Sequence, residues 1–307
     1  MTDKVDIRQI YISRINKVMN FVENNLDKEL SLSYLSEIAH FSPFHFHRLF
    51  SAITEETLNT FIKRKRIEKI ASLLLNGDST PLTELAFKYG FNSGASFSRT
   101  FKKFYGISAS EFKENSKEQY SKIGKVESKN GKEVITFEKY ICSINNILNW
   151  INMNAQIEVK EMPELKLAYI KHVGDFNQIG KVYEKLMKWA GPKGLLNSSE
   201  LKTVTVYHDD PKVTKMSKVR QSACITLNNQ VKLSGEVGEM TIPKGKYAVG
   251  RFEISVTEFE KAWDSISVWV AENGCENRDG DYYELYHNDH MEHPEQKFIL
   301  DICVPVE

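Results

Sequence analysis

Two arginines in this chain stand in the same local pattern. Arg48 has a phenylalanine two residues before it and another two residues after it, and so has Arg99. In a helix those phenylalanines share one face and the arginine between them lies on the other. A guanidinium can donate two hydrogen bonds to guanine or clamp a phosphate. We therefore predict two helices that are anchored by phenylalanine and read DNA with arginine.

Neighbouring residues suit the same task. Phe44 and Ala95 can touch thymine methyl groups, and His47 can donate to or accept from a base edge. Gly94 and Ser96 stand beside Ala95 on the expected outer face. We expect these residues to lie against DNA together with the two arginines.

Other basic residues suit the phosphate backbone, because phosphate contacts depend on positive charge. They are Lys63, Arg64, Arg66, Lys102 and Lys103. For each of them a solvated charged surface is an equally good interpretation. Either arginine of the repeated pattern could instead pair with a carboxylate inside the domain.

A single carboxylate, Glu284, stands between two tyrosines in an alternating segment. On a strand Tyr282, Glu284 and Tyr286 would share one face. A buried, unpaired carboxylate is costly. A cationic aromatic ligand would relieve that cost and add cation–π attraction. We predict that this face binds such a ligand; the alternative is a surface glutamate or one paired with a lysine.

Further aromatic residues could line the same site, although each could equally belong to the core. They are Tyr169, Phe176, Tyr207, Tyr247 and Trp269. His287, His290 and His293 recur three residues apart, but their surroundings read as a loop without cysteine. We expect no metal and no cofactor.

The elements that position the arginines are two helix-turn-helix units, over residues 31–53 and 82–104. Leu32 and Leu35 of the first unit recur as Leu82 and Leu85 of the second. Ser42, followed by proline, marks the start of a second helix. A long helix over 58–76 would join the units. This pattern predicts an all-α DNA-binding domain over residues 1–115 that places two helices in the major groove.

The back half, residues 157–307, contains a second internal repeat. Tyr183 and Trp189 of one copy align with Trp263 and Trp269 of the other, and Glu284 has Thr205 as its counterpart. Each copy has the pattern strand, helix, strand, strand. Two such modules predict an α+β domain with its helices on one face. Residues 115–133 are polar and lysine-rich, and residues 133–155 have some apolar character. We expect residues 116–156 to be a linker, so the protein is multidomain.

Composition bounds the function. The zero net charge of the 307 residues combines a basic front half with an acidic back half, which suggests different partners for each. No apolar run is long enough for a membrane span, and the first residues do not read as a signal peptide. Four scattered cysteines favour a reducing compartment, so we expect a cytoplasmic protein without a membrane partner.

Residues 12–115 resemble the DNA-binding domain of AraC-type transcription factors, especially the Rob-like branch. The resemblance rests on Tyr89-Gly90-Phe91 and on the run from Phe97 to Gly106. His40 and Glu55 stand where that family commonly has glycine.

Residues 157–307 resemble a GyrI-like effector-binding domain. The matching segments include His172 to Phe176, Val206 to Pro211 and Tyr283 to Tyr286. In that family a glutamate in the last motif commonly contacts cationic lipophilic ligands, which the resemblance extends to Glu284.

These observations predict a transcription regulator, not an enzyme. It would bind double-stranded DNA and a small, cationic, lipophilic effector, with RNA polymerase as a further potential partner. One alternative is a regulator fused to a GyrI-like hydrolase that uses Glu284 as a general base. Another is a constitutive DNA-binding protein without a ligand.

Overall fold

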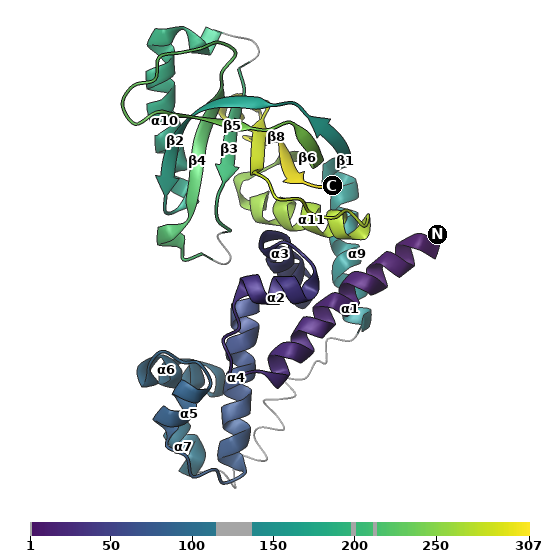
Figure 1. The fold of residues 1–307 in the computed structure, drawn as a ribbon, viewed down its shortest axis with the longest axis vertical. Helices are drawn as coiled ribbons and strands as arrows, with labels where there is room; N and C mark the ends of the chain where they lie inside the picture. Colours follow the sequence, from purple (N-terminus) through teal and green to yellow (C-terminus); the bar gives the residue numbers. More distant parts are fainter. Residues whose placement is uncertain (1, 115–136, 198–200, 211–213) are drawn as a thin grey trace. The chain divides into compact units, whose positions relative to one another are not determined.

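The computed structural model describes residues 2–114, 137–197, 201–210 and 214–307 (Figure 1). The chain divides into two compact units, residues 9–144 and residues 1–8 together with 145–307. The first unit is helical and the second is built on one sheet. The predicted class, an all-α domain followed by an α+β domain, is confirmed.

The helical unit contains both predicted helix-turn-helix units. They are α2–α3 and α5–α6, joined by the long helix α4. The helices are α1 (Thr2–Asn24), α2 (Leu32–Ala39), α3 (Pro43–Thr54), α4 (Leu58–Leu75), α5 (Leu82–Lys88), α6 (Gly94–Tyr105), α7 (Ala109–Glu114) and α9 (Phe137–Asn154). The first residues of α1 and the last of α9 belong to the other unit. Among the described helices, none is long and apolar enough to cross a bilayer.

Local sequence explains where these helices begin and end. Ser42 and Ser93 cap α3 and α6, each accepting a hydrogen bond from a backbone N–H in the first turn. His40 and Glu55 end α2 and α3 with φ of 55° and 59°. Both therefore hold the left-handed conformation that glycine usually supplies. The departure from the family pattern at these two positions leaves the turn geometry intact.

The second unit holds one eight-stranded antiparallel sheet in the order β1-β6-β8-β7-β3-β4-β2-β5. Its strands are β1 (Ala155–Met162), β2 (Leu165–Val173), β3 (Thr203–Tyr207), β4 (Arg220–Thr226), β5 (Gly238–Ile242), β6 (Gly245–Ile254), β7 (Tyr282–Tyr286) and β8 (Phe298–Pro305). Its helices are α10 (Ile179–Ala190) and α11 (Phe259–Glu272). The order strand, helix, strand, strand occurs twice, as β2-α10-β3-β4 and β6-α11-β7-β8.

Both of these helices pack on the same face of the sheet. Gly250, Ile302, Glu284, Thr205 and Ala223 follow one another as cross-strand neighbours, so they share a face. Helix α11 meets this row at Gly250, where an added Cβ would lie 3.3 Å from Ile266. Helix α10 packs around Ala223 at the other end of the row. Glu284 therefore lies in the middle of the helix-covered face.

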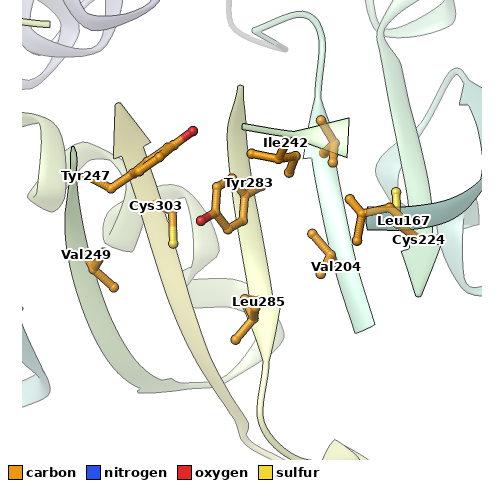
Figure 2. Packing of buried hydrophobic residues seen from close by; sticks show 10 residues of the cluster. Leu167, Val204, Cys224, Ile242, Tyr247, Val249, Tyr283, Leu285 and Cys303 are labelled. Atoms are coloured by element: carbon orange, nitrogen blue, oxygen red, sulfur yellow. The ribbon is translucent and has the colours of Figure 1, made fainter. Parts of the chain in front are cut away.

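The opposite face carries a second buried cluster (Figure 2). It includes Leu167, Val204, Cys224, Tyr247, Tyr283 and Cys303. Only two residues link β1 to β2, although these strands are first and seventh in the sheet, and two residues link β5 to β6. Such short links require the sheet to curl until its edges approach. Figure 1 shows the segment from β1 to β2 crossing over the other strands, and the curled face encloses this cluster.

Residues 137–156 of the predicted linker have regular secondary structure. They form α9 and the start of β1 because apolar residues recur at helical spacing there, with Ile144, Trp150 and Ile151 buried. Residues 115–136 of the predicted linker lie outside the described part of the chain. The sequence pattern also gave no indication of β1 and β5.

Candidate DNA-reading and effector-binding sites

Helix α6 presents the predicted reading surface. Phe97 and Phe101 are buried, whereas Arg99 and Ala95 are exposed on the other side of the helix. The Nε of Arg99 donates to the carbonyl of Ala95 at 3.3 Å, which holds the side chain along the helix. Gly94 and Ser96 are half-buried in the first turn. Lys102 and Lys103 are exposed in the last turn, so α6 combines possible base contacts with possible phosphate contacts.

Helix α3 differs from α6, and the expected exposure of Arg48 and His47 is wrong. Their exposed fractions are 4% and 2%. The guanidinium of Arg48 lies 4.8 Å from the centre of the half-buried Phe44 ring, one helical turn earlier. Ala95 takes the place of Phe44 in α6 and offers no ring. The i,i+4 stack on Phe44 is thus one contact of Arg48 that Arg99 lacks.

The cations of α4 are mostly engaged inside the helical unit. Arg64 pairs with Glu56 and with Glu68, and these carboxylates raise its pKa against the lowering effect of burial. Arg66 donates to backbone carbonyls. Both arginines are therefore engaged within the helical unit, and their contact with phosphate stays a prediction. Lys63 is exposed on the same helix.

The sheet unit buries Glu284 completely and surrounds it with hydrogen-bond donors. Its Oε1 accepts from the indole N–H of Trp263 at 2.7 Å. Its Oε2 accepts from the hydroxyls of Tyr207 at 2.9 Å and Tyr286 at 2.5 Å. An indole can only donate, so the carboxylate oxygen facing it must accept. The predicted surface-glutamate alternative is wrong, and the carboxylate is held by three neutral aromatic donors.

A second layer of hydroxyls fixes these donors. Thr205 is the cross-strand neighbour of Glu284. Its Oγ1 lies 3.3 Å from the hydroxyl of Tyr286 and 2.9 Å from that of Tyr183 on α10. Burial raises the pKa of Tyr183 and of Tyr286 well above the ordinary phenol value, with the Glu284 charge adding to the effect at Tyr286. Both phenols therefore stay protonated at neutral pH and remain able to donate.

Most of the predicted aromatic lining is near Glu284, but not all. The Phe176 ring lies 5.9 Å from that of Tyr207, and Tyr282 is the register partner of Tyr207. Trp269 lies on α11, half-buried. The lining prediction is wrong for Tyr169 and Tyr247, because both belong to the buried cluster on the opposite face of the sheet.

Strand alternation explains these two errors. Tyr169 pairs with Cys224, one position away from the row that contains Glu284, and a shift of one residue reverses the face. Tyr247 instead packs against Tyr283 at 5.4 Å. Sequence reasoning also left Tyr183 and Trp263 out of the site. The two residues align with each other in the internal repeat and lie on equivalent helices, α10 and α11. This equivalence could have indicated that both belong to the site.

The three histidines do not converge. His287 donates its Nε2–H to Asp301 at 2.9 Å, His290 stacks on Phe298 at 4.1 Å, and His293 lies 3.6 Å from Glu253. Across the described ranges, no group of three or more His, Cys, Asp or Glu side chains is arranged to hold a metal ion.

Comparison with known proteins adds two domain families and several relatives. Residues 155–307 match the GyrI-like small molecule binding domain, and residues 35–115 match a helix-turn-helix domain. The transposon Tn10 TetD protein of Escherichia coli is 34% identical over 110 residues, which cover 36% of this chain and 79% of TetD. The multiple antibiotic resistance protein MarA of Escherichia coli K12 is 32% identical over 93 residues, covering 30% of this chain and 72% of MarA.

Among solved structures, the crystal structure of the EcmrR C-terminal domain is similar. It is 22% identical, covers 50% of this chain and 98% of its own, and superposes with a TM-score of 0.41.

Proposed function

Because this chain belongs to the AraC-type transcription regulators and carries a GyrI-like small molecule binding domain, we propose that its effector is a lipophilic cation bound at Glu284. We also propose that α6 reads DNA bases through Arg99. Binding to promoter DNA would place the protein in the cytoplasm, with RNA polymerase as a further partner.

The buried Glu284 carboxylate carries the effector proposal. Three aromatic side chains, Trp263, Tyr207 and Tyr286, supply both its hydrogen bonds and nearby π surfaces. The rings of Tyr207 and Trp263 meet edge to face at 5.3 Å. A cation with aromatic substituents would gain from the negative charge and from the rings at once. A neutral or anionic compound would gain only from the rings.

The exposed side of α6 carries the DNA proposal. Arg99 is exposed in the middle of the helix, and Lys102 and Lys103 are exposed at its end. Arg99 suits a guanine edge in the major groove, whereas the two lysines and Lys63 suit phosphates. Arg48 is a weaker candidate for base reading because its guanidinium is stacked on Phe44.

The DNA proposal is tested with a duplex selected by the wild-type chain from a random-sequence pool. We expect Arg99→Ala to weaken binding to the selected duplex by roughly 5- to 150-fold, the equivalent of about 1–3 kcal/mol, and to leave binding to random duplex almost unchanged. Lys103→Ala is the matched comparison, because loss of a phosphate contact weakens both duplexes alike. Equal affinities of Arg99→Ala and wild type for the selected duplex would remove Arg99 from the reading surface.

The effector proposal is tested on the same duplex. Saturating tetraphenylphosphonium, used as a simple lipophilic cation, should change the affinity of the wild-type chain for the duplex or the transcription that it supports. Triphenylphosphine oxide, a neutral compound of similar shape, should have a much smaller effect. Equal effects of the two compounds would mean that the site does not select for positive charge.

A hydrolase remains the second candidate because of one observation. Glu284 is in direct hydrogen-bond contact with Tyr207 and Tyr286, and a carboxylate beside a phenol can act as a base–acid pair. We favour effector binding because the sheet unit is fused to a DNA-binding domain. Turnover of small electrophilic esters or epoxides that is lost in Glu284→Gln would support catalysis instead.

A further inference from the structure

We propose that Arg66 fixes the distance and orientation between the two helix-turn-helix units and so selects the spacing of the DNA half-sites. This inference rests on the proposed reading of DNA by α6 and on the sequence-based prediction that α3 of the first unit also enters the major groove. The residue lies in the middle of α4, the helix that joins them, and its hydrogen bonds to Leu26, Lys28 and Gly90 are within the helical unit.

The guanidinium of Arg66 connects α4 with two segments that are far from it in the sequence, residues 26–28 and Gly90. Its Nε donates to the carbonyl of Leu26 at 2.9 Å, and its Nη2 donates to that of Lys28 at 2.8 Å. Both carbonyls lie in the segment that leads from α1 into the first helix-turn-helix unit. Its Nη1 donates to the carbonyl of Gly90 at 3.3 Å, in the turn of the second unit. One side chain therefore contacts the entry of unit one and the turn of unit two.

The surroundings favour a cation at this point. Helix α1 ends at Asn24 and α5 ends at Lys88, so the carbonyls that Arg66 contacts follow the negative ends of two helix dipoles. A planar guanidinium can reach several carbonyls with fixed geometry, which a lysine ammonium cannot reproduce.

The turn of the second unit is shaped around Arg66. Gly90 has φ of 69°, and a Cβ added there would lie 2.4 Å from Nη1 of Arg66. Any side chain at this position would displace the guanidinium. The glycine therefore meets two requirements, the left-handed backbone and the close approach of Arg66.

The other cations of α4 do not bridge the two units in this way. Arg64 contacts Glu56 and Glu68, close to it in the sequence, and Lys65 contacts Glu23 of α1. Their contacts lie on the side of unit one. Among these α4 contacts, the hydrogen bond from Arg66 to the Gly90 carbonyl is the one that links α4 to the turn of unit two.

A fixed link has a measurable consequence on DNA. Neighbouring major-groove sites are separated by about 10–10.5 base pairs, so inserting one base pair moves and rotates one half-site relative to the other. A rigid protein loses contacts on such a duplex, whereas a protein with a loosened link adjusts.

The test measures binding of the full chain to the duplex selected by wild type and to duplexes with one base pair added or removed between the half-sites. We expect wild type to lose about tenfold or more on the altered spacings. Arg66→Gln and Arg66→Lys should lose roughly threefold or less of their affinity on the altered spacings, because neither side chain reproduces the geometry of the guanidinium. Arg66→Lys keeps the positive charge, so it separates the effect of geometry from that of charge. Lys69→Gln, an exposed charge loss on the same helix, should behave like wild type.

Several results would overturn the proposal. One is an unchanged spacing preference in folded Arg66→Lys, with folding checked by circular dichroism. Another is an equal loss of affinity on all three duplexes, which would give Arg66 a purely structural role. Gly90→Ala should shift the preference in the same direction as Arg66→Lys. If wild type itself shows no spacing preference, then DNA reading by both units is wrong, which is a different failure.

Discussion

Replacing Glu284 with glutamine tests the effector site most directly. The change keeps the size of the side chain but removes its charge. Glu284 is fully buried and accepts from Trp263, Tyr207 and Tyr286. A glutamine has one oxygen, so its NH₂ group would face at least one of these donors. We expect weaker binding of a lipophilic cation.

The magnitude follows from the contacts. A cation about 4 Å from the carboxylate gains about 4 kcal/mol at an effective dielectric constant near 20. To admit it, the carboxylate gives up one of its three donors, and a hydrogen bond to a charged group contributes about 1.5–3 kcal/mol. The difference, about 1–2.5 kcal/mol, corresponds to an affinity loss of roughly 5- to 70-fold on Glu284→Gln.

Isothermal titration with tetraphenylphosphonium measures this loss, and triphenylphosphine oxide serves as the neutral control. Trp263→Phe is a matched variant, because it removes one donor to Glu284 and keeps both the charge and an aromatic ring. It should retain most of the cation affinity. Equal affinity of wild type and Glu284→Gln for the cation would refute the electrostatic reasoning. An equal loss of affinity for the neutral compound would indicate that the substitution disturbs the structure around residue 284 instead.

Two further predictions concern stability. Burial alone would raise the pKa of Asp301, but hydrogen bonds from His287 and Arg251 outweigh it and hold the pKa at about 2, below the ordinary value of 3.8. The ionised carboxylate therefore stabilises the fold fully above pH 5, and this stabilisation is lost as the pH falls through 3.8 toward 2. In urea unfolding followed by tryptophan fluorescence, the stability advantage of wild type over Asp301→Asn should shrink by about 2 kcal/mol over this pH range. His40 holds φ of 55°, a left-handed conformation that is strained for a residue with a Cβ, so His40→Gly should raise the stability of the helical unit by about 0.5–1 kcal/mol. Gly106 holds φ of 81°, so Gly106→Ala should introduce the same strain and lower the stability by about 1 kcal/mol. Thermal unfolding followed by circular dichroism checks the pair; a stabilised Gly106→Ala or a destabilised His40→Gly would contradict the assignment of backbone strain.

Much of the fold could be predicted from local patterns. Serine caps, helical spacing and the repeated phenylalanines indicated α3 and α6 within a residue or two of their bounds. Strand alternation indicated β7 and placed Glu284 with Tyr286 on one face. These signals are local, because caps and alternation depend on neighbours in the sequence.

The errors arose where tertiary contacts decide. Whether Arg64 contacts a phosphate or Glu56 depends on how α4 packs, and composition alone does not reveal it. Tyr247 was assigned to the wrong face because the register between strands was unknown. The stack of Arg48 on Phe44 could have been predicted, since the two residues stand four apart on one helix.

The pairing of β1 has a consequence for synthesis of the protein. This strand leaves the ribosome before any other in the sheet, yet its partner is β6, which follows only after β2 to β5. Until β6 emerges, the backbone groups of β1 have no native ladder to join. Nascent chains would therefore carry an open strand edge through most of translation of the second unit, a stage at which chaperone binding or aggregation competes with folding.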